Sequence, residues 1–202
     1  KALQEALGMD RPPLVMECFD IANIGTAHCV ASMVRFKDGV PDNANYRRYR
    51  IRAVTGQNDF ISMAEVIRRR FSRILLEGRE AMGEQGDYSQ ENPLEMMRRL
   101  EKEPPSGEEV EELLPEETEV KKTKKKPAFI RLPDLVIVDG GKGQLGMAMK
   151  ELQRLGLSDL PLIGLAKQHE EIYRPHEPDP LLLSHDTGAV SYTHLRAHET
   201  LR

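Results

Sequence analysis

Two aspartates each stand at the end of an apolar, strand-forming run. Asp20 comes late in LVMECFDIANI, residues 14–24, and Asp139 closes LVIVD, residues 135–139. Two carboxylates brought within a few ångströms repel each other, and a divalent cation compensates that repulsion. Mg²⁺ or Mn²⁺ prefers oxygen ligands, keeps several waters and binds phosphate. The pair therefore indicates metal-assisted hydrolysis of a phosphodiester, provided that the fold brings the two acids together.

The residues after Asp139 are suited to an anion. Gly140 and Gly141 allow a backbone to approach closely, and the helix-like stretch that follows offers its N-terminal amides. Lys142 is a candidate phosphate contact. GGKGQ does not fit the phosphate-binding pattern G-x-x-x-x-G-K-[ST]. Either aspartate alone could equally be a helix cap or a turn former, so the metal hypothesis depends on the pair.

Residues 14–54 predict three strands joined by short turns. The first, 14–24, is apolar enough for a buried central strand, and HCVASMVRF at 28–36 follows it. YRRYRIRAV at 46–54 alternates like a half-buried strand. A helix is then predicted from a cap at Asn58. Its apolar face would hold Phe60, Met63, Val66, Ile67 and Phe71.

The second half predicts a strand at 132–139, a helix at 142–157 and a strand at 160–167, followed by a Pro-rich hairpin at 170–183. A strand–helix–strand unit implies parallel pairing with a right-handed crossover. A three-strand meander followed by alternating helices and parallel strands is the order of an α/β, ribonuclease H-like mixed sheet. In that sheet the first and fourth strands are neighbours, which would bring Asp20 and Asp139 together.

The length of 202 residues suits one domain with an insertion, or two small ones. Residues 78–127 are rich in Glu, Lys and Pro, and a segment of this composition is predicted to be a charged, largely disordered insertion, although NPLEMMRRLEKE within it is suited to one amphipathic helix. The predicted organisation is a lead-in at 1–13, a first domain part at 14–77, this insertion, a second part at 128–189, and a tail at 190–202.

Composition points to a protein of the cytoplasm. The chain is 39% hydrophobic and 31% charged, and no apolar run nears the roughly 18 residues of a membrane span. The N-terminus lacks the apolar region of a signal peptide. Cys18 and Cys29 have no CxxC or histidine partner at ligand spacing, which argues against a disulfide or a zinc site. We therefore expect no membrane partner.

The net charge of −4 is unevenly distributed. Residues 74–127 hold 15 acidic and 9 basic residues, a net of −6, so the remainder, with 18 acidic and 20 basic residues, carries +2. Basic residues cluster at 46–52 and 68–73. A solvated helix face is the alternative for the second cluster. The candidate contacts to a DNA backbone are Arg47, Arg48, Arg68, Arg69 and Arg70.

Several segments, in order, resemble the C-terminal endonuclease domain of the UvrC family, which belongs to the bacterial nucleotide excision repair nuclease. They cover most of residues 14–189 outside the insertion: ECFDIANI, VASMVRFKDG, YRRYRI, NDFISMAEVIRRRFSR, LPDLVIVDGGKGQL, IGLAKQHEEIY and LLLSHDTGA. The resemblance implies Mg²⁺- or Mn²⁺-dependent incision 5′ to a lesion in double-stranded DNA, after UvrA and UvrB have located it.

The resemblance also implies roles for single residues. The catalytic, metal-binding acids of the family map onto Asp20 and Asp139. A further important acid maps onto Asp59, for which a helix-start acid is the alternative. The lysine of the LAK motif maps onto Lys167, either as a phosphate contact or as a strand-end charge.

Two departures from the family pattern bear on activity. Ala22 and Asn23 stand where the family has Ser-His. Beyond LLLSHDTGA, whose Asp186 matches a family acid, the family continues into a helix with a catalytic histidine. Here VSYTHLRAHETLR, residues 190–202, resembles translated sequencing-adapter sequence, so we expect a non-native tail in which His198 is not a ligand. We therefore expect this chain to cleave DNA weakly or not at all.

Two other functions remain open. One is a different ribonuclease H-like polynucleotidyl transferase, such as a transposase or resolvase. The other is a non-catalytic module that binds DNA or a protein through its basic strand and helix. A cation site that depends on both Asp20 and Asp139 would separate the two enzymes from the binding module.

Overall fold

The computed structural model describes residues 1–24, 28–53, 58–82, 92–102, 131–166 and 171–182. The helices are α1 (Ala2–Leu7), α2 (Asp59–Met82), α3 (Pro93–Lys102) and α4 (Lys142–Arg154), with a 3₁₀ turn, η1, at Asn43–Asn45. The strands are β1 (Val15–Ile24), β2 (His28–Lys37), β3 (Val40–Pro41), β4 (Arg47–Arg50), β5 (Leu135–Asp139), β6 (Leu162–Ala166), β7 (Glu171–Tyr173) and β8 (Leu181–Leu182).

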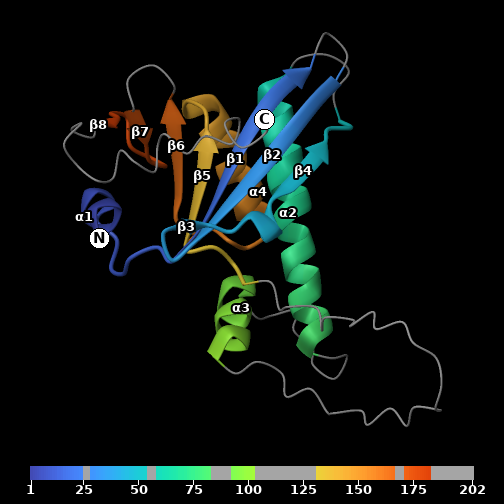
Figure 1. The fold of residues 1–202 in the computed structure, drawn as a ribbon, viewed down its shortest axis with the longest axis vertical. Helices are drawn as coiled ribbons and strands as arrows, with labels where there is room; N and C mark the ends of the chain where they lie inside the picture. Colours follow the sequence, from blue (N-terminus) through green and yellow to red (C-terminus); the bar gives the residue numbers. More distant parts are fainter. Residues whose placement is uncertain (25–27, 54–57, 83–91, 103–130, 167–170, 183–202) are drawn as a thin grey trace, which may run out of the picture.

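The strands form one mixed sheet in the order β3-β2-β1-β5-β6-β7-β8, with β4 also paired to β2 (Figure 1). The central pairs β1–β5 and β5–β6 are parallel. The outer pairs are antiparallel, β2 with β1 on one side and β7 with β6 on the other. The predicted α/β, ribonuclease H-like mixed sheet is confirmed, including the parallel contact between β1 and β5.

The turn between β2 and β3 shows how local sequence fixes the meander. Lys37 pairs with Val40 across a two-residue turn. Its central residues, Asp38 and Gly39, have φ angles of 52° and 81°. A two-residue hairpin turn with both central φ angles positive matches the right-handed twist of the strands, and Asp-Gly is a favoured sequence for it.

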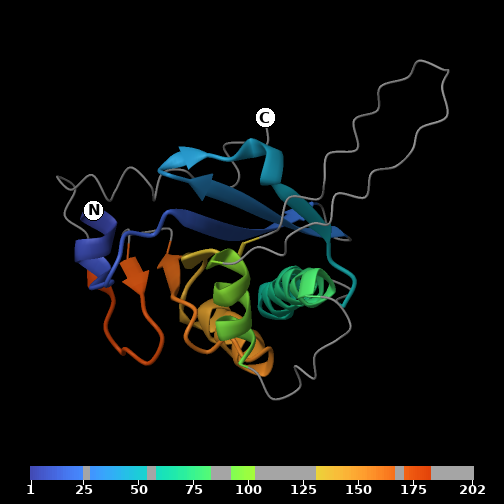
Figure 2. The same ribbon diagram turned by 90° about the horizontal axis from the view of Figure 1, so that it is seen from below.

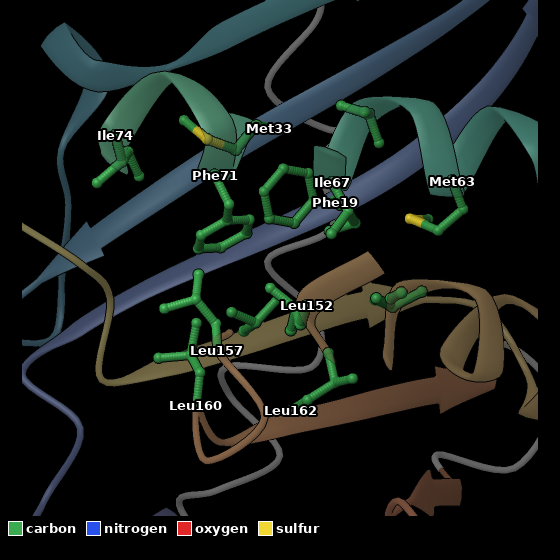
Figure 3. Packing of buried hydrophobic residues seen from close by; sticks show 14 of the residues in the cluster. Phe19, Met33, Met63, Ile67, Phe71, Ile74, Leu152, Leu157, Leu160 and Leu162 are labelled. Atoms are coloured by element: carbon green, nitrogen blue, oxygen red, sulfur yellow. The ribbon is translucent and has the colours of Figure 1, made fainter. Parts of the chain in front are cut away.

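Helices α2 and α4 cover one face of the sheet, and α3 packs against α2 on the same side (Figure 1 and Figure 2). The backbone N–H of Ile61 donates to Asn58 Oδ1 at 3.1 Å, so Asn58 caps α2 as predicted. From α2, Met63, Ile67 and Phe71 point into the main core together with residues of β1 and α4 (Figure 3). The rings of Phe19 and Phe71 lie 6.2 Å apart, which ties β1 directly to α2.

The opposite face of the sheet has a second, smaller core. Met16 and Cys18 of β1 pack there beside Leu135 and Ile137 of β5. Among the described helices, α1 covers this face through Leu3. Alternation along each strand therefore assigns even-numbered residues of β1 and odd-numbered residues of β5 to this face.

The start of the charged segment is more ordered than its composition predicts. Helix α2 continues to Met82, past the predicted boundary at residue 78. Helix α3 forms where NPLEMMRRLEKE allowed one, and its Leu94, Met96 and Met97 are buried in the main core. These apolar side chains belong to the same core as residues of α2, against which α3 packs, and composition alone does not show this contact. Residues 103–130 and the tail at 190–202 lie outside the described residues.

Within the described ranges, no helix is both long enough and apolar enough to cross a membrane.

We predict that Gly164→Ala destabilises the fold at the strand that carries Asp139. A Cβ at Gly164 would lie 2.9 Å from the carbonyl oxygen of Gly140, and a backbone atom cannot move aside as a side chain can. Overpacking of this kind costs about 1–3 kcal/mol, measured as the free energy of unfolding in urea.

Gly146→Ala is the matched control. No atom lies within 4 Å of a Cβ at Gly146, which is inside α4. Alanine in a helix interior is about 0.5–1 kcal/mol better than glycine, so this variant should be more stable. Equal effects of the two substitutions would contradict the proposed close contact between β6 and the Gly140 backbone.

Candidate metal centre

Asp20 and Asp139 lie on the neighbouring central strands β1 and β5. Phe19 pairs with Val138 in the parallel ladder of β1 and β5, so the next rung joins Asp20 to Asp139. Adjacent strands are roughly 4.8 Å apart, and residues on one rung of a parallel pair share a face. Both acids thus point to the face of the second core, away from α2 and α4.

Both acids are buried, with relative exposures of 2% for Asp20 and 6% for Asp139. Their charges act on the same neighbour, Cys18, which lies two residues before Asp20 on the same face. The pKa of the Cys18 thiol is raised first by burial and then by the negative charges of Asp139 and Asp20. Cys18 is thus an inert buried thiol, and its environment shows that both carboxylates lie close to it.

The donor chemistry of this pair fits a hard divalent cation. It consists of carboxylate oxygens, the donors that such an ion prefers. Within the described ranges no third His, Cys, Asp or Glu joins them in a group that could hold a metal ion. A magnesium-type ion fits two carboxylates because it keeps several water ligands. The segment expected to carry a family histidine, together with Asp186 and His198, lies outside the described residues.

A polar row crosses the sheet at the level of Asp20. In the antiparallel ladders Asp20 pairs with Ser32, and Ser32 pairs with Arg48. Directly paired residues share a face, so the row on the acid face runs Arg48, Ser32, Asp20, Asp139. Sequence reasoning missed Ser32. The sequence predicts a strand at 28–36, but assigning Ser32 to the acid face requires the register between β1 and β2.

Asp59 belongs to the helix side of the site. It is the first residue of α2, as predicted, and its Oδ1 accepts a hydrogen bond of 3.0 Å from the amide of Asn23. Asn23 alternates with Ile21 and Phe19, whose side chains pack in the helix-covered core. The bond thus ties α2 to the end of β1. A direct metal role for Asp59 stays a prediction.

Lys142 is the first residue of α4, directly after the two glycines. Its Nζ donates to the carbonyl oxygen of Pro178 at 2.5 Å and lies 5.4 Å from the ring centroid of Tyr173. Here the ammonium therefore holds the β7–β8 connection against α4. A phosphate contact by Lys142 stays a prediction, and Lys167 lies outside the described residues.

The candidate arginines fall into different environments. Arg48 is exposed on the acid face, and Arg50, which sequence reasoning did not single out, alternates with it on the same strand. Arg47 faces the helix side and donates to the carbonyl oxygens of Ala44 and Tyr46.

On α2, Arg68 is exposed, whereas Arg69 is tied to its surroundings. Arg69 donates to Glu65 at 3.0 Å and to the Arg50 carbonyl oxygen at 2.8 Å, and it lies over the ring of Tyr49. Its guanidinium thereby fastens β4 to α2.

The profile of the UvrC RNAse H endonuclease domain matches residues 4–198. The chain belongs to this family. A curated relative, UvrABC system protein C of Corynebacterium diphtheriae, is 40% identical over 191 residues, covering 93% of this chain and 25% of that protein. The protein of the same name from Dehalococcoides mccartyi (strain ATCC BAA-2100 / JCM 16839 / KCTC 5957 / BAV1) is 37% identical, covering 93% and 23%.

The chain thus spans about a quarter of the length of these UvrC relatives. The profile match reaches into the segment from residue 190 that was predicted to be non-native. Among solved structures, Ciona intestinalis endonuclease V in complex with an inosine-containing DNA aligns over 94% of this chain and 58% of its own. The identity is 14% and the TM-score 0.34, too low to carry an argument.

In this UvrC domain Arg70 is a structural residue, which corrects its prediction as a DNA contact. It is only 5% exposed, and its guanidinium donates two hydrogen bonds to the fully buried carboxylate of Glu17, at 2.5 and 3.0 Å. Arg35, 3.5 Å from Glu17, also reaches Asp42 at 3.4 Å. The basic run on α2 thus alternates between the surface and the interior, because a helix turns about 100° per residue.

We predict that Arg70→Ala destabilises the domain by about 3–5 kcal/mol, because it leaves the buried Glu17 carboxylate without its bidentate partner. Denaturant unfolding measures the loss. Arg68→Ala, two residues earlier and exposed, is the matched control, with an expected change within about 0.5 kcal/mol. A small effect of Arg70→Ala would show that Glu17 is not held as described.

Proposed function

We propose that this chain is the part of a UvrC protein that hydrolyses a phosphodiester on the 5′ side of a DNA lesion, with Mg²⁺ or Mn²⁺ bound by Asp20 and Asp139. The observation that carries the proposal is the pairing of Phe19 with Val138, which puts the next residues, the buried Asp20 and Asp139, beside each other on one face of the sheet. Membership in the UvrC endonuclease family supports the reaction class.

The roles of the two acids follow from their geometry. Asp20 and Asp139 would hold one cation from the neighbouring strands β1 and β5. When bound, the ion would supply a water nucleophile and stabilise the charge that develops on the phosphate. Beside Asp139, the Gln144 side chain occupies the space where a Cβ at Gly140 would stand, whereas Gly141 has no such neighbour. The α4 N-terminus that follows the two glycines favours an anion.

The DNA would lie across the acid face toward β4. Arg48 is two strands from Asp20, roughly 10 Å away at the spacing of a sheet. Its guanidinium, and that of Arg50, would then contact phosphates next to the one being cleaved. Such contacts do not depend on base sequence, which suits a nuclease directed to lesions by other proteins. We propose UvrA and UvrB as those partners, and the cytoplasm as the location.

Replacing either acid tests the metal centre. Asp139→Asn and Asp20→Asn keep the side-chain shape but remove a charge, so each should abolish the cation site in calorimetric Mn²⁺ titrations. In the UvrC protein that carries this domain, 5′ incision of damaged duplex should fall on the order of 100- to 1000-fold, equal to several kcal/mol of lost transition-state stabilisation.

Asp159→Asn is the control, since Asp159 is exposed in the α4–β6 connection, at the far end of the sheet. It should leave both measurements unchanged. Unaltered incision in the Asp20 and Asp139 variants would instead favour a non-catalytic module.

The proposed path of the DNA leads to a separate prediction for Arg48. Arg48→Ala should weaken binding equally across DNA sequences and reduce the slope of log affinity against log salt by roughly 0.7–0.9. Fluorescence anisotropy at several salt concentrations measures both. Lys37→Ala, exposed at the opposite end of β2, is the control. Equal slopes for the two variants would place the DNA elsewhere.

A further inference from the structure

Ser32 is a buried polar residue at the metal centre that the proposed function does not use. It is 4% exposed and is the ladder partner of Asp20 on the acid face. Among the described residues its hydroxyl finds no hydrogen-bond partner. Buried hydroxyls in folded proteins are nearly always paired, so an unpaired one next to a carboxylate pair points to a missing ligand.

Ser62 is a second buried serine, and its hydroxyl has hydrogen-bond partners within the protein. It is fully buried in α2, where its hydroxyl donates to the Asn58 carbonyl oxygen at 2.8 Å and lies 3.2 Å from Cys29 Sγ. Ser62 is thus satisfied entirely by protein atoms on the helix side. A buried serine of this protein can therefore have hydrogen-bond partners. The missing partner of Ser32 among the described residues is a feature of its place on the acid face.

The spacing of the row decides what Ser32 can reach. The Cα atoms of paired antiparallel residues are about 4.5–5.5 Å apart, so the short Ser32 side chain lies next to Asp20 but a full strand further from Asp139. A cation shared by the two acids is therefore too far for direct ligation by Ser32. A water bound to that cation lies within reach, and magnesium-type ions keep such waters.

We propose that the Ser32 hydroxyl hydrogen-bonds a water ligand of the cation held by Asp20 and Asp139. Ser32 is then a positioning residue that orients the water from outside the first coordination sphere. The inference rests on the proposed metal centre. Outer partners of this kind typically change metal affinity or activity by about 10- to 100-fold when they are removed.

The test measures Mn²⁺ affinity by calorimetry on the whole chain, together with the urea midpoint of the metal-free chain. Ser32→Ala should weaken Mn²⁺ binding about 10- to 100-fold. It should leave the metal-free midpoint unchanged or higher, because it removes a buried hydroxyl that has no protein partner to lose. Ser32→Thr, which keeps the hydroxyl, should retain most of the affinity.

Ser62→Ala is the matched control. It should lower the metal-free midpoint, because its hydroxyl has protein partners, and leave Mn²⁺ affinity unchanged. Asp139→Asn separates the two proposals. If Asp139→Asn abolishes Mn²⁺ binding while Ser32→Ala binds Mn²⁺ normally, the proposed role of Ser32 is wrong and the proposed metal centre is supported.

If Asp139→Asn also binds normally, the metal centre itself is wrong. A loss of metal-free stability in Ser32→Ala as large as that in Ser62→Ala would show that Ser32 has a protein partner, and would overturn the proposal.

Discussion

The parallel pairing of β1 with β5 is the constraint on which the rest of the site depends. The two strands are more than a hundred residues apart in the chain, yet their register puts Asp20 and Asp139 on one rung. A shift of one residue in either strand would turn its acid to the opposite face, because side chains alternate along a strand. The apolar residues before both acids, buried on both faces, hold this register.

Strand β1 carries two buried acids that have different neighbours. Glu17 faces the helix layer, where Arg70 and Arg35 neutralise it and join α2 to β2. Asp20, three residues later, faces the other side and lies beside a second carboxylate. The first arrangement pairs opposite charges and makes the sheet–helix contact specific. The second concentrates negative charge in one place, which is how a protein builds a cation site.

The face of the sheet that carries the acids also carries the basic residues of β4. Helices α2 and α4 pack on the other face, and of the described helices only α1 packs on this one. Arg48 and Arg50 project from the same face on β4, beside β2. The same strands position the carboxylates, the Ser32 hydroxyl and the arginines, so the proposed metal centre and the proposed DNA path share one face of the sheet.

The sequence by itself determined the longer strands, the Asn58 cap, the turn after β2, the two acids and the UvrC resemblance. These depend on local periodicity, turn chemistry or a matched motif. It did not determine the length of α2, the order of α3, the inward direction of Arg70, or the places of Ser32, Arg50 and Lys142. Those depend on which surfaces meet. Only tertiary structure, through register between distant strands and helix rotation against the sheet, decides whether a charge meets solvent, an opposite charge or another acid.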